Sequence, residues 1–218
     1  MPRGVYMSAR RIIAVLLAAG QSRRMNRPKL FMPYGEGNIL DAVIDAVMES
    51  SVDGLMVVGN PRVGKYLDGL LPDQCAAVIN DDAASEMLTS VQIGVRAVID
   101  RFEPAADDGI LLLLGDQPTV GAGTVTSLAE AYRLPRRPPG ILIATYRGRR
   151  GHPTVFSLGL LREVLEWPAG RRLNELVREQ GGEAREFPIH TAPIPIDVNT
   201  PEDYERLNRS PTPPKYSL

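Results

Sequence analysis

The sequence contains one cysteine and two histidines among its 218 residues. A lone cysteine, Cys75, cannot form a disulfide within the chain, so we expect a reducing compartment, most simply the cytoplasm. The scarcity of thiol and imidazole groups argues against a zinc site, which usually needs several such ligands. The sequence also lacks an excess of charge of either sign, since it has 25 Lys and Arg residues and 26 Asp and Glu residues. We therefore expect no nucleic-acid partner and no membrane partner, although a local basic pocket for phosphates is compatible with this balance.

The sequence also lacks an apolar run long enough to cross a bilayer. Its run at 12–19 holds eight apolar residues, whereas a membrane-spanning helix needs about 20. Arginines before the run give it a superficial likeness to a signal peptide. However, Arg23, Arg24 and Lys29 follow it at once, which is unusual at the start of an exported chain. A first β-strand buried on both faces is the better interpretation.

Short apolar segments alternate with segments of helical periodicity along most of the chain. We expect strands at 12–17, 55–58, 76–79, 110–114, 141–145 and 155–158, and helices at 39–48, 91–99, 124–132, 160–167, 173–180 and from 201 onward. This alternation predicts an α/β protein, here a Rossmann-like three-layer α/β/α fold with a mainly parallel twisted sheet. We expect one domain over residues 10–208, followed by a disordered tail at 209–218.

The residues after the first predicted strand form a candidate phosphate-binding loop. Small residues at 18–20 allow a ligand to approach the backbone, whose N–H groups can point at phosphate oxygens. Ser22 adds a hydroxyl donor, and Arg24 and Lys29 add the positive charge that a triphosphate needs. The alternative is a solvated basic turn, since the segment is neither a Walker loop nor a GxGxxG fingerprint.

A carboxylate ends another buried strand. Asp116 directly follows the apolar segment 110–114, and the carboxyl ends of such strands are where open α/β sheets bind ligands. Magnesium prefers oxygen ligands and usually takes only one or two carboxylates, the rest being water and phosphate oxygens. Asp116 is therefore a candidate metal ligand. The alternative is that it only initiates a turn with Pro118.

The first loop has a recognisable pattern, Leu-Ala-(Ala/Gly)-Gly-x-x-x-Arg-Met-x-x-x-Lys. Its fixed positions are filled by Leu17, Ala18, Ala19, Gly20, Arg24, Met25 and Lys29. The segment resembles the signature loop of the NTP-transferase superfamily, which has the nucleotide-diphospho-sugar transferase fold, and above all the molybdenum cofactor cytidylyltransferases and their guanylyl relatives. Asn26 stands where a Gly usually follows the Met. Ala19 followed by Gly20-x-Ser22 is similar to the cytidylyl branch, and the resemblance therefore implies CTP.

The resemblance extends to two acidic motifs. Residues 115–118 match the superfamily's Gly-Asp-x-Pro, and 197–203 resemble Asp-Val-Asp-Thr-Pro-Glu-Asp, with Asn199 at the second acidic position. This implies that Mg²⁺ is bound by Asp116 together with Asn199 or Asp197. Thr200 before Pro201 is also a good helix start, and both interpretations can hold at once.

Two further segments resemble substrate-binding stretches of the cytidylyltransferases. Residues 80–90 are similar to the base-recognition stretch at Asn80, Met87 and Ser90, with Glu86 in place of a Gly. Residues 150–153 are similar to the Arg-Gly-His-Pro turn beside the acceptor pocket, which implies that His152 contacts the acceptor. The alternative for 80–90 is a polar loop before a helix, and the alternative for 150–153 is a purely structural turn. The segment 167–172 lacks the acidic residue of the family's Gly-Asp-x-Gly-Ala-Arg, which leaves the acceptor open.

The resemblance implies a magnesium-dependent nucleotidyltransferase. CMP would pass from CTP to a phosphorylated acceptor, in the first instance molybdopterin, with release of pyrophosphate. Asp116, Arg24 and Lys29 would be the catalytic residues, because such transfers need positioning and charge neutralisation rather than a covalent nucleophile. The resemblance also implies docking to a molybdoenzyme or its chaperone. The alternatives are a sugar phosphate or another phosphorylated metabolite as the acceptor, and a maturation factor that binds nucleotide without turnover.

Overall fold

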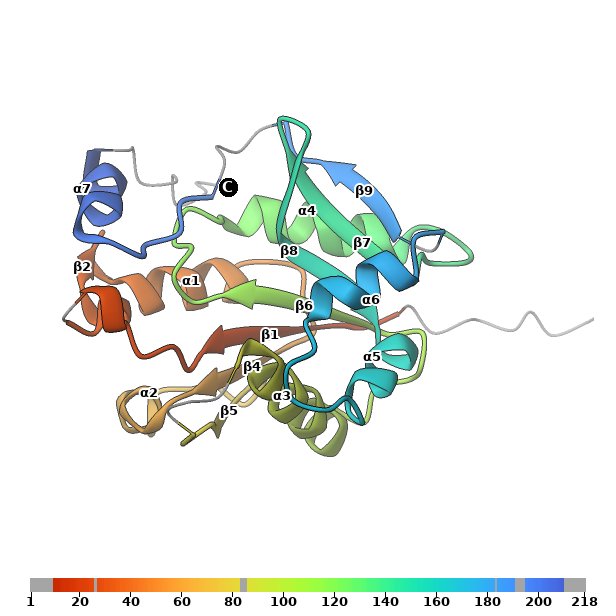
Figure 1. The fold of residues 1–218 in the computed structure, drawn as a ribbon, viewed down its shortest axis with the longest axis horizontal. Coiled ribbons are helices and arrows are strands. Elements are labelled where there is room, and N and C mark those ends of the chain that lie inside the picture. Colours follow the sequence, from red (N-terminus) through yellow and green to blue (C-terminus); the bar gives the residue numbers. More distant parts are fainter. Residues whose placement is uncertain (1–9, 26, 83–85, 183, 191–194, 210–218) are drawn as a thin grey trace, which may run out of the picture.

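The computed structural model describes residues 10–25, 27–82, 86–182, 184–190 and 195–209. Within them, one seven-stranded sheet lies between two layers of helices (Figure 1). This arrangement confirms the predicted three-layer α/β fold. The tail was expected to be disordered. From residue 210 onward it lies outside the described ranges.

The sheet is mostly parallel. In spatial order, its strands are β5 (Cys75–Ile79), β4 (Gly54–Gly59), β1 (Ile12–Ala18), β6 (Gly109–Leu114), β8 (Arg149–Ser157), β7 (Ile141–Tyr146) and β9 (Ala184–Pro188). Only β8 runs antiparallel to its neighbours, β6 and β7, among these strands. A separate two-stranded ribbon joins β2 (Pro33–Tyr34) to β3 (Gly37–Asn38).

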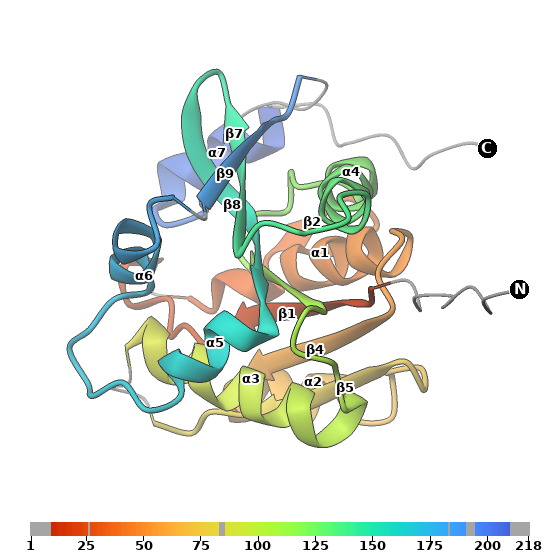
Figure 2. The same cartoon turned by 90° about the vertical axis from the view of Figure 1, so that its right-hand side faces the viewer.

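Helices cover both faces of the sheet. The helices are α1 (Ile39–Met48), α2 (Pro61–Leu67), α3 (Met87–Phe102), α4 (Ala122–Arg133), α5 (Leu158–Val164), α6 (Leu173–Glu179) and α7 (Pro201–Arg209), with short 3-10 turns η1 (Arg23–Met25) and η2 (Lys29–Phe31). Side chains of α1, α2 and α4 pack in one core, and those of α3, α5 and α6 pack in the other. Figure 2 shows α1 and α4 on the opposite side of the sheet from α5 and α6. Because both faces are covered, the central strands are continuously apolar rather than alternating. No helix in the described ranges has the length and apolar character needed to cross a membrane.

Among the differences from the sequence-based expectation, three have a clear local cause. The strand expected at 155–158 extends back to Arg149, because its polar first half pairs with β7 as one arm of a hairpin. Helix α2 was not expected, because Asn60-Pro61 looks like a turn; instead, Asn60 caps the helix by accepting from the backbone of Arg62 and Val63, and Pro61 takes the first helical position. Strand β9 was missed because it is a largely polar edge strand.

The strand order brings distant segments together at one edge of the sheet. Strands β1 and β6 are parallel neighbours, with Leu17 opposite Leu114, so the loops that follow them begin side by side. The N–H of Gly115 donates to the carbonyl of Leu17 at 2.9 Å. A Cβ atom at Gly115 would lie 3.2 Å from that same oxygen, so glycine permits this close approach. The N–H of Val198 donates to the carbonyl of Asp116 at 3.1 Å, which brings the segment before α7 to the same edge.

Close packing at Gly94 holds α3 against the sheet. A Cβ atom there would lie 2.7 Å from Cγ2 of Val58 and 2.9 Å from Cγ1 of Val15, well inside normal carbon contact distances. We expect Gly94→Ala to lower the free energy of unfolding by about 1–3 kcal/mol, because both valines are buried and stiff. Urea denaturation measures this change. Gly182→Ala, whose Cβ would meet no atom within 4 Å, is the control. Equal stability of the two variants would contradict the close packing.

Candidate active site

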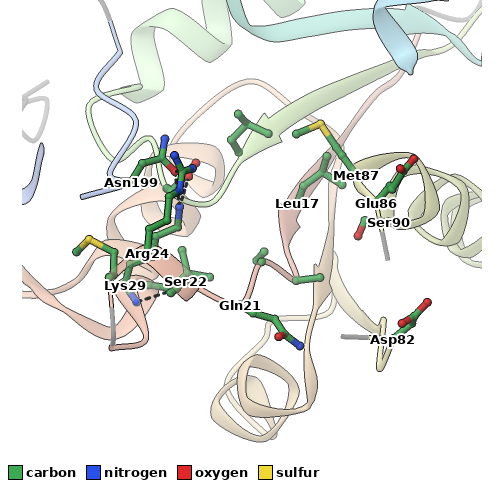
Figure 3. Close-up of a pocket in the computed structure, with 17 residues that line it drawn as sticks. Leu17, Gln21, Ser22, Arg24, Lys29, Asp82, Glu86, Met87, Ser90 and Asn199 are labelled. Atoms are coloured by element: carbon green, nitrogen blue, oxygen red, sulfur yellow. Dashed lines mark hydrogen bonds and ion pairs between the residues drawn. The ribbon is translucent and has the colours of Figure 1, made fainter. Parts of the chain in front are cut away.

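A cavity of about 410 Å³ lies at the carboxyl ends of β1 and β6, beside the first turn of α3 (Figure 3). Its walls come from segments far apart in the sequence. The cavity is lined by Leu17, Ala18, Ala19, Gly20, Gln21, Ser22, Arg24, Met25, Lys29, Leu30, Asp82, Glu86, Met87, Ser90, Leu114, Asp116 and Asn199. The structure thus brings the first loop together with Asp116, Asn199 and Ser90, as the sequence motifs predict. Asn80, Asp197 and His152 lie elsewhere.

The polar centre of this cavity is a small network around Lys29. The ammonium group of Lys29 donates to Oδ2 of Asp116 at 2.5 Å and to Oδ1 of Asn199 at 3.2 Å. Arg24 donates to the same Asn199 oxygen at 3.1 Å. The side chains of Lys29 and Asp116 are only 12% and 18% exposed, so water screens their attraction weakly. One carboxylate oxygen and one amide oxygen therefore both accept from the same ammonium group.

The first loop is held in shape by its own polar groups. Ser22 has a positive φ of 54°, and its carbonyl accepts from the N–H of Met25 at 2.9 Å. Its hydroxyl oxygen accepts from the N–H of Lys29 at 3.0 Å, which closes the loop. The buried side chains of Met25 and Leu30 anchor the loop to the core. Because a hydroxyl can accept and donate at once, Ser22 could also donate to a ligand.

Asn199 lines the first cavity, whereas Asp197 does not. The carboxylate of Asp203 accepts from the backbone N–H groups of Asn199 and Thr200, and Thr200 caps the backbone of Asp203 in return. Burial opposes ionisation of Asp203, but these N–H groups and Arg206 hold the pKa of that carboxyl below its usual value. This start of α7 fixes Asn199 on the cavity wall. Asp197 instead accepts from Nε2 of Gln117 at 2.5 Å and lines only a neighbouring polar cavity, to whose wall Asn199 also contributes.

The base-recognition segment is only partly described, because residues 83–85 lie outside the described ranges. Asn80 is 3% exposed and does not line the cavity. Its amide donates to the hydroxyl oxygen of Ser90 at 2.9 Å, so it orients a residue that does line it. Glu86 lies at the N-terminus of α3, and its carboxylate accepts from the N–H of Gly170 at 3.2 Å. Glu86 therefore links the wall of this cavity to the segment before α6.

A second cavity of about 840 Å³ adjoins the first and shares Glu86 and Met87 with it. His152 lies on its wall and also lines the polar cavity that contains Asp197. Burial lowers the pKa of the His152 imidazole, although a hydrogen bond to the backbone of Leu112 and the carboxylates of Asp197 and Asp116 oppose this. We therefore expect a neutral ring at pH 7.

The second cavity contains arginines that sequence analysis did not single out. Its lining is mostly apolar, with Arg150, Arg171, Arg172 and Arg178 among its walls. Arg171 stacks on Trp167, with its guanidinium carbon 3.5 Å from the ring centroid, and pairs with Glu175. Arg172 and Arg178 have no ion-pair partner within the described ranges. The available signal was the run Arg171-Arg172, which occupies the place of the family's Ala-Arg.

Comparisons with known proteins agree with this geometry. The family of MobA-like NTP transferase domains matches residues 14–184. The molybdenum cofactor cytidylyltransferase of Escherichia coli K12 is 28% identical over 88% of this chain and 93% of its own length. The molybdenum cofactor guanylyltransferase of Mesorhizobium japonicum is 27% identical over 92% of this chain and 96% of its own. Among solved structures, Rv0371c of Mycobacterium tuberculosis H37Rv superposes with a TM-score of 0.79 at 28% identity, covering 94% of this chain and all of its own; it has also been solved in complex with manganese.

Proposed function

We propose, from the premise that this chain belongs to the MobA-like NTP transferase family and is a nucleotidyltransferase, that it transfers CMP from CTP to molybdopterin with release of pyrophosphate. The observation that carries the proposal is the meeting of Lys29, Asp116 and Asn199 in one cavity at the carboxyl ends of β1 and β6. A cytoplasmic location and docking to a molybdoenzyme or its chaperone belong to the same proposal. They rest on the lone cysteine and on the relatives respectively.

The first loop would bind the triphosphate. Small residues at 18–20 line the cavity, so phosphate oxygens can reach the backbone N–H groups. Arg24 and Lys29 would neutralise the phosphates and stabilise the charge that builds up on the leaving pyrophosphate. An oxygen of the acceptor phosphate would attack the α-phosphorus, and the bond to the bridging oxygen of the β-phosphate would break. The pyrophosphate takes the electron pair of that bond.

The oxygens of Asp116 and Asn199 fit a divalent cation. They converge on the position now taken by an ammonium group, and one carboxylate plus one neutral oxygen suits Mg²⁺, whose other ligands are usually water and phosphate. When bound, the ion would neutralise the phosphates and orient them for in-line attack. Within the described ranges, no group of three His, Cys, Asp or Glu side chains is arranged to hold a metal. The protein ligands proposed here are therefore Asp116 and Asn199, with Asp197 acting at most indirectly.

The acceptor would bind in the second cavity. This cavity adjoins the first at Glu86 and Met87, and its apolar walls and its arginines suit a large molecule that carries anionic groups. His152 would contact the acceptor from the wall, without an acid–base role. A sugar phosphate fits these walls less well, because it offers little apolar surface to bury.

Pyrophosphate release tests the proposed function. With Mg²⁺ and molybdopterin, we expect CTP to give the highest rate among CTP, GTP, ATP and UTP, and we expect little release without the acceptor. Direct identification of the cytidylylated acceptor by mass spectrometry would exclude simple hydrolysis. A preference for GTP would refute the cytidylyl assignment, whereas tight CTP binding with no release would favour a non-catalytic maturation factor.

A further inference from the structure

The two proposed metal ligands are engaged by cations of the protein itself. Lys29 lies between Oδ2 of Asp116 and Oδ1 of Asn199, at 2.5 and 3.2 Å, and Arg24 lies 3.1 Å from the same Asn199 oxygen. Figure 3 shows Arg24, Lys29 and Asn199 gathered at one end of the cavity. A divalent cation cannot take this position while the ammonium group stays there.

The charge at this end of the cavity is positive. Asp116 contributes one negative charge, Arg24 and Lys29 contribute two positive charges, and the Asn199 amide contributes none. Of the nearby carboxylates, Asp203 pairs with Arg206, and Asp197 lies on the neighbouring polar cavity and does not line this one. Asp82 and Glu86 also line the cavity, but Figure 3 places them across it from Lys29. A free divalent cation would therefore meet net repulsion at its own ligands.

A metal–nucleotide complex, unlike the free cation, is attracted to this end of the cavity. A triphosphate with one divalent ion keeps a net negative charge, so Arg24 and Lys29 attract it. Its phosphates also offer these two side chains new partners, which would release the oxygens of Asp116 and Asn199.

We propose that Lys29 is a placeholder for the divalent cation, and that the metal enters this site only as a complex with the nucleotide. Asn199 is essential to this arrangement, because a carboxylate at 199 would balance the charge and admit the free ion. The inference rests on the proposed function, since it assumes that the cavity binds a metal–nucleotide complex.

Titration of the protein with Mn²⁺ alone, followed by electron paramagnetic resonance, tests the placeholder role without any turnover. We expect wild-type protein to leave nearly all Mn²⁺ free, and we expect Lys29→Met and Asn199→Asp to bind it at least about tenfold more tightly. The first removes one positive charge and the second adds one negative charge within a few ångströms of the metal position. Arg27→Met is the matched control. It removes a positive charge from an exposed residue of the same loop that does not line the cavity, and we expect it to behave as wild type.

Two results would overturn the inference. One is tight binding of free Mn²⁺ by wild-type protein, and the other is unchanged binding in both Lys29→Met and Asn199→Asp. Thermal unfolding of each variant shows whether it is folded. Because one variant removes a positive charge and the other adds a negative charge, the test still works if one of them fails to fold. Failure of the proposed function looks different: Mn²⁺ with a non-hydrolysable CTP analogue would then show no protein-dependent signal. Tight free Mn²⁺ binding with normal pyrophosphate release would remove only the placeholder role.

Discussion

Asp116→Ala is expected to lower the rate of pyrophosphate release by a factor of about 10³. The substitution removes a carboxylate from the cationic end of the cavity, where it accepts from Lys29 at 2.5 Å. Loss of one preorganised group that positions charge in a transition state typically costs a factor of about 10²–10³, and a metal ligand lies at the upper end of that range. Steady-state rates at saturating CTP and Mg²⁺ measure the effect.

Asp197→Ala is the matched comparison for this prediction. Asp197 is a carboxylate of the neighbouring segment, but it lines a different cavity and pairs with Gln117. We expect its loss to cost less than about tenfold, through disturbance of the segment that carries Asn199. Equal losses in the two variants would restore Asp197 as the second metal ligand, and retained activity in Asp116→Ala would refute the metal assignment.

Lys29→Ala is expected to lower kcat/KM for CTP by a factor of about 10²–10³, with a raised KM as well as a lowered kcat. A lysine that meets phosphates in both the ground state and the transition state contributes to both constants. Removal of its charge also leaves Asp116 without its main partner in the free protein. Initial rates over a range of CTP concentrations separate the two constants.

Arg27→Ala is the control for Lys29, because Arg27 is exposed and lies off the cavity in the same loop. We expect a change of less than about twofold. If both variants lose activity equally, the loop contributes only a diffuse positive field, and the specific contact of Lys29 with phosphate is wrong.

Much of the fold could be predicted from local patterns. Strands β1 and β6 are buried on both faces, so they could be predicted from continuous apolar runs. The small residues after β1 and the carboxylate after β6 indicated the edge of the sheet at which a ligand would bind. Polar elements were harder. Asn60-Pro61 reads equally well as a turn and as the start of α2, and β9 has no continuous apolar face to reveal it.

The partners of individual site residues could not be predicted, because tertiary hydrogen bonds select them. Asp197 and Asn199 are two positions apart, and the sequence left both open as candidates. The bond from Val198 to the carbonyl of Asp116, together with the pairing of Gln117 with Asp197, places Asn199 in the cavity and Asp197 outside it. The arginines of the second cavity were hidden for the same reason, since only the packing of α6 brings Arg172 and Arg178 to one wall. The catalytic roles themselves stay predictions until the variants are measured.

The adjacency of β1 and β6 has a consequence for how the protein reaches its native state. The register pairs Leu17 with Leu114, nearly half the sequence apart, and Asn199 joins only from the segment before α7. Closing such long intervals carries an entropic penalty before any contact compensates for it, and chains rich in distant pairings fold slowly. If Asn199 is a metal ligand as proposed, the complete site cannot form during synthesis until the chain has been made as far as residue 199. We expect ligand affinity to appear in the last phase of refolding, after most secondary structure has formed.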